Sequence, residues 1–173
     1  VYIIEQQKDG RYAKEFFGTS SGSRYKAIYP AGLRYHGPDP LNYVGRYDHV
    51  NGPTSESYLD LIVLLDALNN TPLGKPLLDA LQPLIDMDAY LWTLAGNALL
   101  CNWDSYQSNT HNYYMLFDGG QQRFYLQTHD LDLTFGTNRP WPNYPITAGF
   151  NKFTRPLSAR PWKHVPFRQE FWN

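Results

Sequence analysis

An α+β fold is predicted from the order in which two kinds of apolar pattern follow each other along this 173-residue chain. Runs rich in β-branched and aromatic residues, typical of strands, occur near the N-terminus and again at residues 112–118 and 123–128. Between them, residues 54–101 carry apolar side chains at helical spacing. Because strands and helices are grouped rather than alternating, we expect a helical half that carries a β-hairpin.

The N-terminal part is expected to form a strand, a helix and a second strand. Residues 1–6 and the RYKAIY run at 24–29 have strand character, and residues 9–17 have helical character that stops at Gly18. Residues 30–53 are rich in Pro, Gly, Asn and Asp. They predict a long irregular segment, and such a segment in a compact domain is usually functional.

Three helices are expected before the hairpin, at 54–70, at 75–84 and from Asp86 to about Cys101. Thr54 or Ser55 can cap the first helix, and Asp86 can cap the third. Gly119 and Gly120 mark the turn of the hairpin. From residue 139 the chain is Pro-rich and predicted to be an irregular basic tail, with six Lys or Arg before Glu170.

Composition excludes several classes of protein. A net charge of −1 argues against a nucleic-acid partner, and 42% apolar residues are enough for a sizeable core. No apolar run reaches the 18 or so residues that a membrane span needs. The single cysteine, Cys101, lies in an apolar run and is predicted to be a small core residue.

Polar side chains gather at the open end of the predicted hairpin. Asn112 opens its first strand, Asp130 and Asp132 follow its second strand, and Asp104 lies on the loop that leads in. Because a hairpin folds back on itself, Asn112 and Asp130 are expected to be neighbours, within reach of Asp104. Carboxylate and amide oxygens suit Mg²⁺, and a carboxylate outside the metal shell can accept a proton. These are the parts used in phosphoryl transfer by protein kinases, with Lys26 as the candidate phosphate contact.

Several assignments stay open at this stage. Asn109 stands five residues after Asp104, the spacing of the catalytic loop in ordinary kinases, and competes with Asn112. Asp130 is the expected metal ligand of the pair, whereas Asp132 is either a second ligand or a structural hydrogen-bond acceptor. His111 and His129 flank the same group and would suit Zn²⁺, which makes a metal-dependent hydrolase a third hypothesis. Glu5 or Glu15 could pair with Lys26, and Glu5 in an apolar run would need a partner.

The chain resembles the CotH kinase family, the atypical kinases named for a spore coat protein. VYIIEQ, KEFFG and YKA resemble its first block, and NWDSY, HNYY, a DGG-type turn and HDLDLTFG resemble its most specific block. The resemblance implies a divergent protein-kinase-like fold and an ATP- and Mg²⁺-dependent kinase. It implies that Asp104 is the proton acceptor, that Asn112 and Asp130 hold metal and that Lys26 contacts phosphates. His129 stands where the resembling members carry Trp.

The resemblance also gives a domain interpretation. We expect a single partial domain over residues 1–173, with 1–30 as the remainder of an incomplete small lobe, 54–136 as a helical lobe and 139–173 as the tail. The family's domain extends upstream, so we expect a fragment.

Three functions are expected from these residues and this resemblance. The first is a kinase that phosphorylates Ser or Thr of a coat or surface protein. The second is a non-catalytic adhesion or coat-assembly module, and the third is the metal-dependent hydrolase. The expected location is the spore coat, the cell surface or outside the cell, and the sequence does not reveal an oligomeric state.

Overall fold

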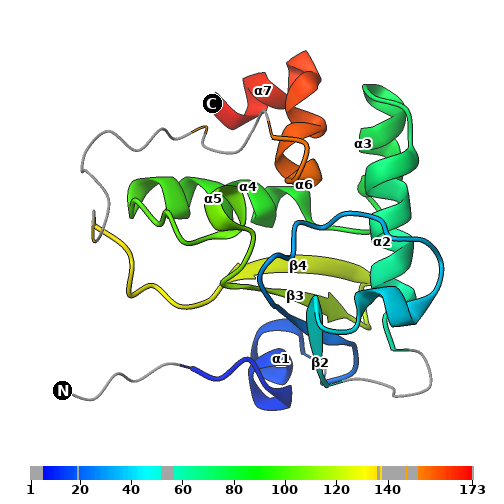
Figure 1. The fold of residues 1–173 in the computed structure, drawn as a ribbon, viewed down its shortest axis with the longest axis vertical. Coiled ribbons are helices and arrows are strands. Elements are labelled where there is room, and N and C mark those ends of the chain that lie inside the picture. Colours follow the sequence, from blue (N-terminus) through cyan, green and yellow to red (C-terminus); the bar gives the residue numbers. More distant parts are fainter. Residues whose placement is uncertain are drawn as a thin grey trace.

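The computed structural model describes residues 6–18, 20–51, 57–135, 137, 147 and 152–172. One antiparallel sheet with the strand order β2-β1-β3-β4 lies between helices (Figure 1). This arrangement confirms the predicted α+β class. The kinase-like form of the fold, the incomplete small lobe and the division into lobes stay predictions.

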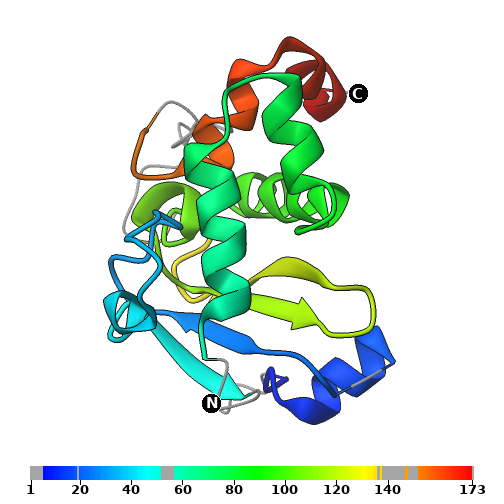
Figure 2. The same cartoon turned by 90° about the vertical axis from the view of Figure 1, so that its right-hand side faces the viewer.

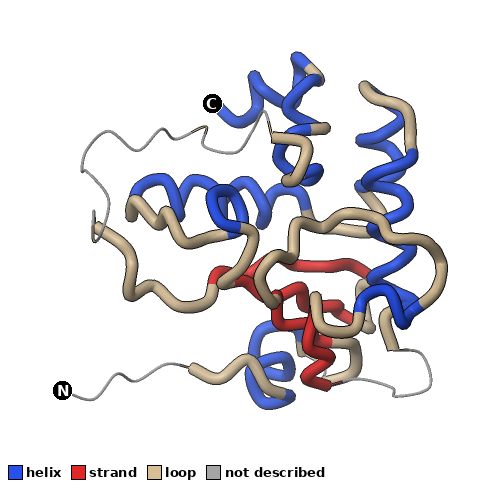
Figure 3. The backbone as a smooth tube through the Cα atoms, viewed as in Figure 1, coloured by secondary structure: helices blue, strands red, loops and turns tan. Residues whose placement is uncertain are grey.

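The sheet is built from β1 (Arg24–Ala27), β2 (Tyr47–Asn51), β3 (Tyr113–Asp118) and β4 (Arg123–Thr128). β3 and β4 form the predicted hairpin. β1 pairs with β3, so the strand that carries Lys26 and the hairpin belong to one sheet, as the adjoining strands in Figure 3 show. The hairpin therefore joins the N-terminal part of the chain to the helical part.

The segment at residues 30–53, predicted to be irregular, contains the 3₁₀ helix η1 (Pro40–Tyr43) as well as β2. The prediction was wrong for these residues. β2 lies at the edge of the sheet and has mostly polar side chains, with only Tyr47 deeply buried. Pairing with β1 stabilises a strand that composition alone does not reveal.

Helix α1 (Gly10–Phe17) is confirmed, and so are its ends. Asp9 accepts hydrogen bonds from the backbone of Arg11 and Tyr12, and Gly18 ends the helix in the left-handed conformation with φ 75°. Both features follow from the chemistry of the caps, since Asp satisfies free N–H groups and Gly tolerates positive φ. The predicted strand at 1–6 lies outside the described residues except for Gln6, which is in no strand.

The helices before the hairpin are α2 (Leu59–Asn70), α3 (Lys75–Leu81) and α4 (Met87–Leu99), followed by the short α5 (Tyr106–Asn109). Asp86 caps α4 by accepting from Ala89 N, as predicted. Thr54 and Ser55 lie outside the described residues.

The described part of the predicted irregular tail is helical. It contains α6 (Pro156–Ala159), the 3₁₀ helix η3 (Pro161–Lys163) and α7 (Val165–Trp172). The prediction was wrong here because prolines were taken as a sign of irregular chain. Pro156 and Pro161 each stand at the start of a short helix, where proline loses no hydrogen bond.

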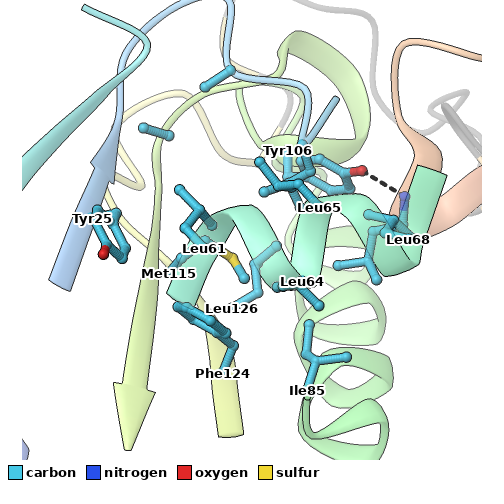
Figure 4. Packing of buried hydrophobic residues seen from close by; sticks show 14 of the residues in the cluster. Tyr25, Leu61, Leu64, Leu65, Leu68, Ile85, Tyr106, Met115, Phe124 and Leu126 are labelled. Carbon is cyan, nitrogen blue, oxygen red and sulfur yellow. Dashed lines mark hydrogen bonds between the residues drawn. The ribbon is translucent and has the colours of Figure 1, made fainter. Parts of the chain in front are cut away.

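The main core lies between one face of the sheet and helices α2 and α4. Figure 4 shows Tyr25, Met115 and Phe124 from the sheet facing the leucines of α2. The hydroxyl of Tyr106 accepts a bond from Leu157 N at 3.0 Å, which attaches α6 to this core. Cys101 is buried, as predicted.

The other face of the sheet packs against α1, where Tyr12 meets Tyr114 and Leu116. Figure 2 shows α1 on the far side of the sheet from α4 and α6. In the described part of the chain, no helix is long and apolar enough to span a membrane.

Candidate active site

Asp104 lies on the short loop between α4 and α5 and is only 7% exposed. Asn109 donates from Nδ2 to its Oδ1 at 2.6 Å, and Asn112 donates from Nδ2 to its Oδ2 at 2.9 Å. The two asparagines that competed in the sequence analysis therefore both contact Asp104, one on each oxygen. A carboxylate offers about four acceptor positions, so a further hydroxyl can still bind.

The backbone around these residues takes unusual conformations. Thr110, Asn112 and Asp130 have φ values of 60°, 53° and 56°, in the left-handed region. Asn112 O accepts a bond from His129 N at 2.8 Å, which closes the open end of the hairpin. Asn and Asp tolerate this region better than most residues, but each such position still costs about 1–3 kcal/mol. Backbone strain on both chain segments at the open end of the hairpin is a feature that functional sites share.

Asp130 and Asp132 are exposed beside this cluster, and Asp132 N donates to Asp130 Oδ1 at 3.3 Å. Desolvation raises the pKa of Asp132, and so do its hydrogen bond with Asp130 and the negative charges of Asp130 and Asp104. The three carboxylates thus repel one another, and a cation would relieve that repulsion. The loop after them is attached to the end of α4, because Phe135 N donates to Leu100 O at 2.8 Å.

These donors fit Mg²⁺ better than Zn²⁺. In the described part of the chain, no three His, Cys, Asp or Glu side chains gather into a metal-binding group. Carboxylate and amide oxygens such as those of Asp130, Asp132 and Asn112 are the kind of donor that Mg²⁺ prefers, together with waters and phosphate oxygens. His111 Nε2 lies 3.4 Å from Asp104 Oδ1, whereas the ring of His129 packs edge-on against Tyr114. The two histidines therefore do not form a zinc set with the aspartates.

A buried polar network beneath Asp104 was not anticipated from the sequence. Asn97 of α4 accepts from Asn102 Nδ2 at 2.9 Å and from Thr128 Oγ1 at 3.1 Å, and it donates to Gln107 Oε1 at 3.3 Å. Ser105 Oγ donates to the same Gln107 oxygen. The network holds the Asp104 loop and the end of β4 to one helix. Its signal in the sequence is an asparagine on the buried stripe of a helix, three residues after Leu94.

Lys26 lies half-buried in the middle of β1, opposite Tyr114 on β3 and Asp48 on β2. Cross-strand partners share a face of the sheet, so Lys26 lies on the same side as Tyr114, whose ring contacts His129. Among the described residues, Lys26 has no ion-pair partner within 4.0 Å. The structure therefore places Lys26 near the open end of the hairpin but not in the Asp104 cluster.

The two glutamates weighed as partners of Lys26 have different outcomes. Glu5 lies outside the described residues. Glu15 is exposed on α1 and accepts from Gln6 Nε2 at 3.1 Å.

Comparison with known protein families identifies the family to which the chain belongs. A family model described as CotH kinase protein matches residues 1–173. The chain belongs to the CotH kinase family. No curated protein matches it. Membership confirms the resemblance drawn from the NWDSY, HNYY and HDLDLTFG blocks, and it suggests an atypical kinase.

Proposed function

We propose that this CotH family member is an atypical, Mg²⁺-dependent protein kinase that transfers the γ-phosphoryl group of ATP to Ser or Thr of a protein substrate. The observation that carries the proposal is the Asp104 carboxylate, held on both oxygens by asparagine amides beside Asp130 and Asp132. This arrangement supplies a fixed proton acceptor next to a cluster of metal-binding oxygens, which is what phosphoryl transfer requires.

Asp104 accepts the proton of the attacking hydroxyl. The bonds from Asn109 and Asn112 fix the plane of its carboxylate, so its free lone pairs have one direction. Orientation of this kind contributes as much as basicity, because a proton acceptor must lie within hydrogen-bonding distance of the hydroxyl.

Asn112, Asp130 and Asp132 would hold Mg²⁺, and Lys26 would contact the non-transferring phosphates. Bound Mg²⁺ neutralises charge on the phosphate oxygens during transfer. The pair of exposed carboxylates keeps this edge of the site negative until a cation binds, and Asn112 links it to Asp104. Family membership further supports a coat or surface protein as the substrate and the spore coat or cell surface as the location.

The variant Asp130→Asn, made in the full-length protein, tests the proposal. Loss of one ligand charge is expected to lower ATP-dependent phosphorylation by about 10²-fold or more, with little change in thermal unfolding. Asp88→Asn, on the exposed first turn of α4, is the matched control. Undiminished phosphate transfer by the Asp130 variant would contradict the assignment.

Simple measurements distinguish the kinase from the two other hypotheses, an adhesion module and a hydrolase. An adhesion or assembly module would show no thermal shift with ATP and Mg²⁺, whereas a kinase is stabilised in proportion to ligand concentration over Kd. A metal-dependent hydrolase would require Zn²⁺ rather than Mg²⁺. The combination of Asp104, Asn112 and Asp130 in one cluster favours the kinase.

A further inference from the structure

A cleft of about 320 Å³ opens beside the Asp104 cluster. Its lining includes three arginines from separate parts of the chain, Arg34, Arg46 and Arg155, together with His36. Asn109, which donates to Asp104, forms part of the same wall. No Asp or Glu lines the cleft among the described residues. It is therefore a positively charged space that borders Asn109, the hydrogen-bond partner of the proposed proton acceptor.

The walls of the cleft are fixed by hydrogen bonds to the core. Ala31 N donates to Thr110 O at 2.8 Å, and the buried hydroxyl of Tyr113 donates to Ala31 O at 2.5 Å. A Cβ added to Gly32 would lie 2.2 Å from Thr154 O, so the two sides of the cleft are in close contact there. These bonds give the arginines a rigid frame.

The arginines differ in how they are held. Arg155 is 8% exposed, and its guanidinium donates to Thr154 Oγ1 at 2.6 Å and to Ser108 O. Arg34 is exposed and lies over the ring of Phe153, with 5.6 Å from its Cζ to the ring centroid. Burial lowers the pKa of His36, and the positive charges of Arg46 and Arg34 lower it further. The cleft thus has a positive field that disfavours the charged form of His36.

The position of the cleft distinguishes two kinds of anion. Asn112, whose backbone oxygen accepts from His129 N next to Asp130, contacts Oδ2 of Asp104, whereas Asn109 contacts Oδ1. In an in-line transfer the attacking hydroxyl approaches the phosphorus from the side opposite to the leaving phosphate oxygen, whose bond to phosphorus breaks. Under the proposed function the nucleotide belongs on the Asn112 side, where Asn112, Asp130 and Asp132 would hold Mg²⁺. The cleft on the Asn109 side then faces the acceptor.

We infer that this cleft binds an anionic side chain of the protein substrate, a phosphoserine or a carboxylate close to the hydroxyl that is phosphorylated. Arginine matches such groups because its planar fork donates two bonds to one phosphate or carboxylate. The inference rests on the proposed kinase function and adds a preference for acidic or already phosphorylated sequences. Such a preference makes phosphorylation of one residue promote that of its neighbour.

Binding is tested first, without turnover, in the full-length protein. Inorganic phosphate and a phosphoserine peptide are titrated while the pKa of His36 is followed by NMR, with His36→Gln used to assign its signal. A bound anion favours the protonated ring, so the pKa of His36 is expected to rise. The double variant R34Q/R46Q is expected to weaken phosphate binding about tenfold, the size of one lost charged hydrogen bond. R11Q, exposed on α1, is the control and keeps wild-type binding.

Turnover then distinguishes the source of the anion. For the wild type, kcat/KM for a peptide with a neighbouring phosphoserine is expected to exceed that for its unphosphorylated counterpart. In R34Q/R46Q the ratio of these two kcat/KM values should fall about tenfold. If R34Q/R46Q weakened ATP binding as much as it weakens phosphate binding, the cleft would belong to the nucleotide and the inference would be overturned. An unchanged His36 pKa in phosphate would also overturn it. Binding with no ATP turnover in the wild type would instead count against the kinase function alone.

Discussion

The two ends of the β3–β4 hairpin use the same residue type for different purposes. At the turn, Asp118 is 1% exposed, and its Oδ1 accepts from the backbone N–H groups of Gly120 and Gln121. At the open end, the Asp104 carboxylate accepts from the side-chain amides of Asn109 and Asn112, and Asp130 and Asp132 are exposed. Asp118 satisfies the backbone that forms the turn. The aspartates at the open end close no turn of the hairpin and repel one another.

The backbone conformation also differs between the two ends of the hairpin. Positive φ at the turn end occurs at Gly22 and Gln122, whereas at the open end it occurs at Asn112 and Asp130. Glycine takes this conformation at little steric cost, but Asn and Asp retain side chains that can bind a ligand. Together with the proposed function, the difference leads us to expect that the turn end serves stability and the open end serves chemistry.

The largest effect is expected from Asp104→Asn. The amide is nearly the same size but cannot accept the proton, so phosphate transfer should fall by about 10²–10⁴-fold. The free energy of unfolding should change far less, because the side chain keeps one acceptor for an asparagine. Steady-state kinetics and chemical denaturation of the same preparation check both parts. Asp118→Asn is the counterpart at the turn, and a comparable loss of turnover there would remove the contrast between the two ends.

The next effect concerns Gly22, which packs against the turn end. A Cβ there would lie 2.0 Å from Phe117 O, at a φ of 112°. Gly22→Ala is therefore expected to destabilise the fold by about 3 kcal/mol or more, since both strain and overlap must be relieved. Gly45→Ala is the matched control, because Gly45 has φ 78° with nothing within 4 Å of a Cβ. It should cost only about 1 kcal/mol in urea denaturation. Equal losses of stability in Gly22→Ala and Gly45→Ala would mean that steric overlap at Gly22 is unimportant.

The third prediction concerns Asn97, whose buried network supports the open end of the hairpin. Asn97→Ala removes the partner of Asn102, Gln107 and Thr128 in a buried network, and each unsatisfied group costs about 1–3 kcal/mol. Unlike Gly22→Ala, this variant should also lower turnover at temperatures where it is folded, because the Asp104 loop loses its attachment to α4. Asn70→Ala, exposed near the end of α2, should do neither. Normal kcat in folded Asn97→Ala would confine the network to a structural role.

Local patterns in the sequence predicted the parts of the fold that local chemistry decides. Gly18 ends α1 and Asp86 caps α4 as expected, and the hairpin forms around its glycine turn. β2 and the helices after residue 152 were missed, because pairing with β1 and packing against the core stabilise them rather than their own composition. The open-end cluster was predicted in outline from hairpin geometry.

The remaining features of the site depend on contacts between distant segments. Asn97 contacts Thr128 across 31 positions, and Arg34 and Arg155 reach one cleft from opposite ends of the chain. Neither contact has a local sequence signal. The contact of both Asn109 and Asn112 with Asp104 likewise depends on the left-handed backbone at Thr110 and Asn112. A spacing rule treats the two asparagines as alternatives, whereas the folded loop uses both.

The smallest effect is expected from substitutions of Asp118 itself. Asp118→Ala leaves the N–H groups of Gly120 and Gln121 without their acceptor and should cost about 1–2 kcal/mol, as the loss of a helix cap does. Asp118→Asn keeps the acceptor oxygen and should cost less than the alanine change. Thermal unfolding of the two variants measures the difference, and their kcat should match the wild type. If Asp118→Asn instead lowered kcat with no loss of stability, the turn end would have a catalytic role. The assignment of stability to the turn end and of chemistry to the open end would then be wrong.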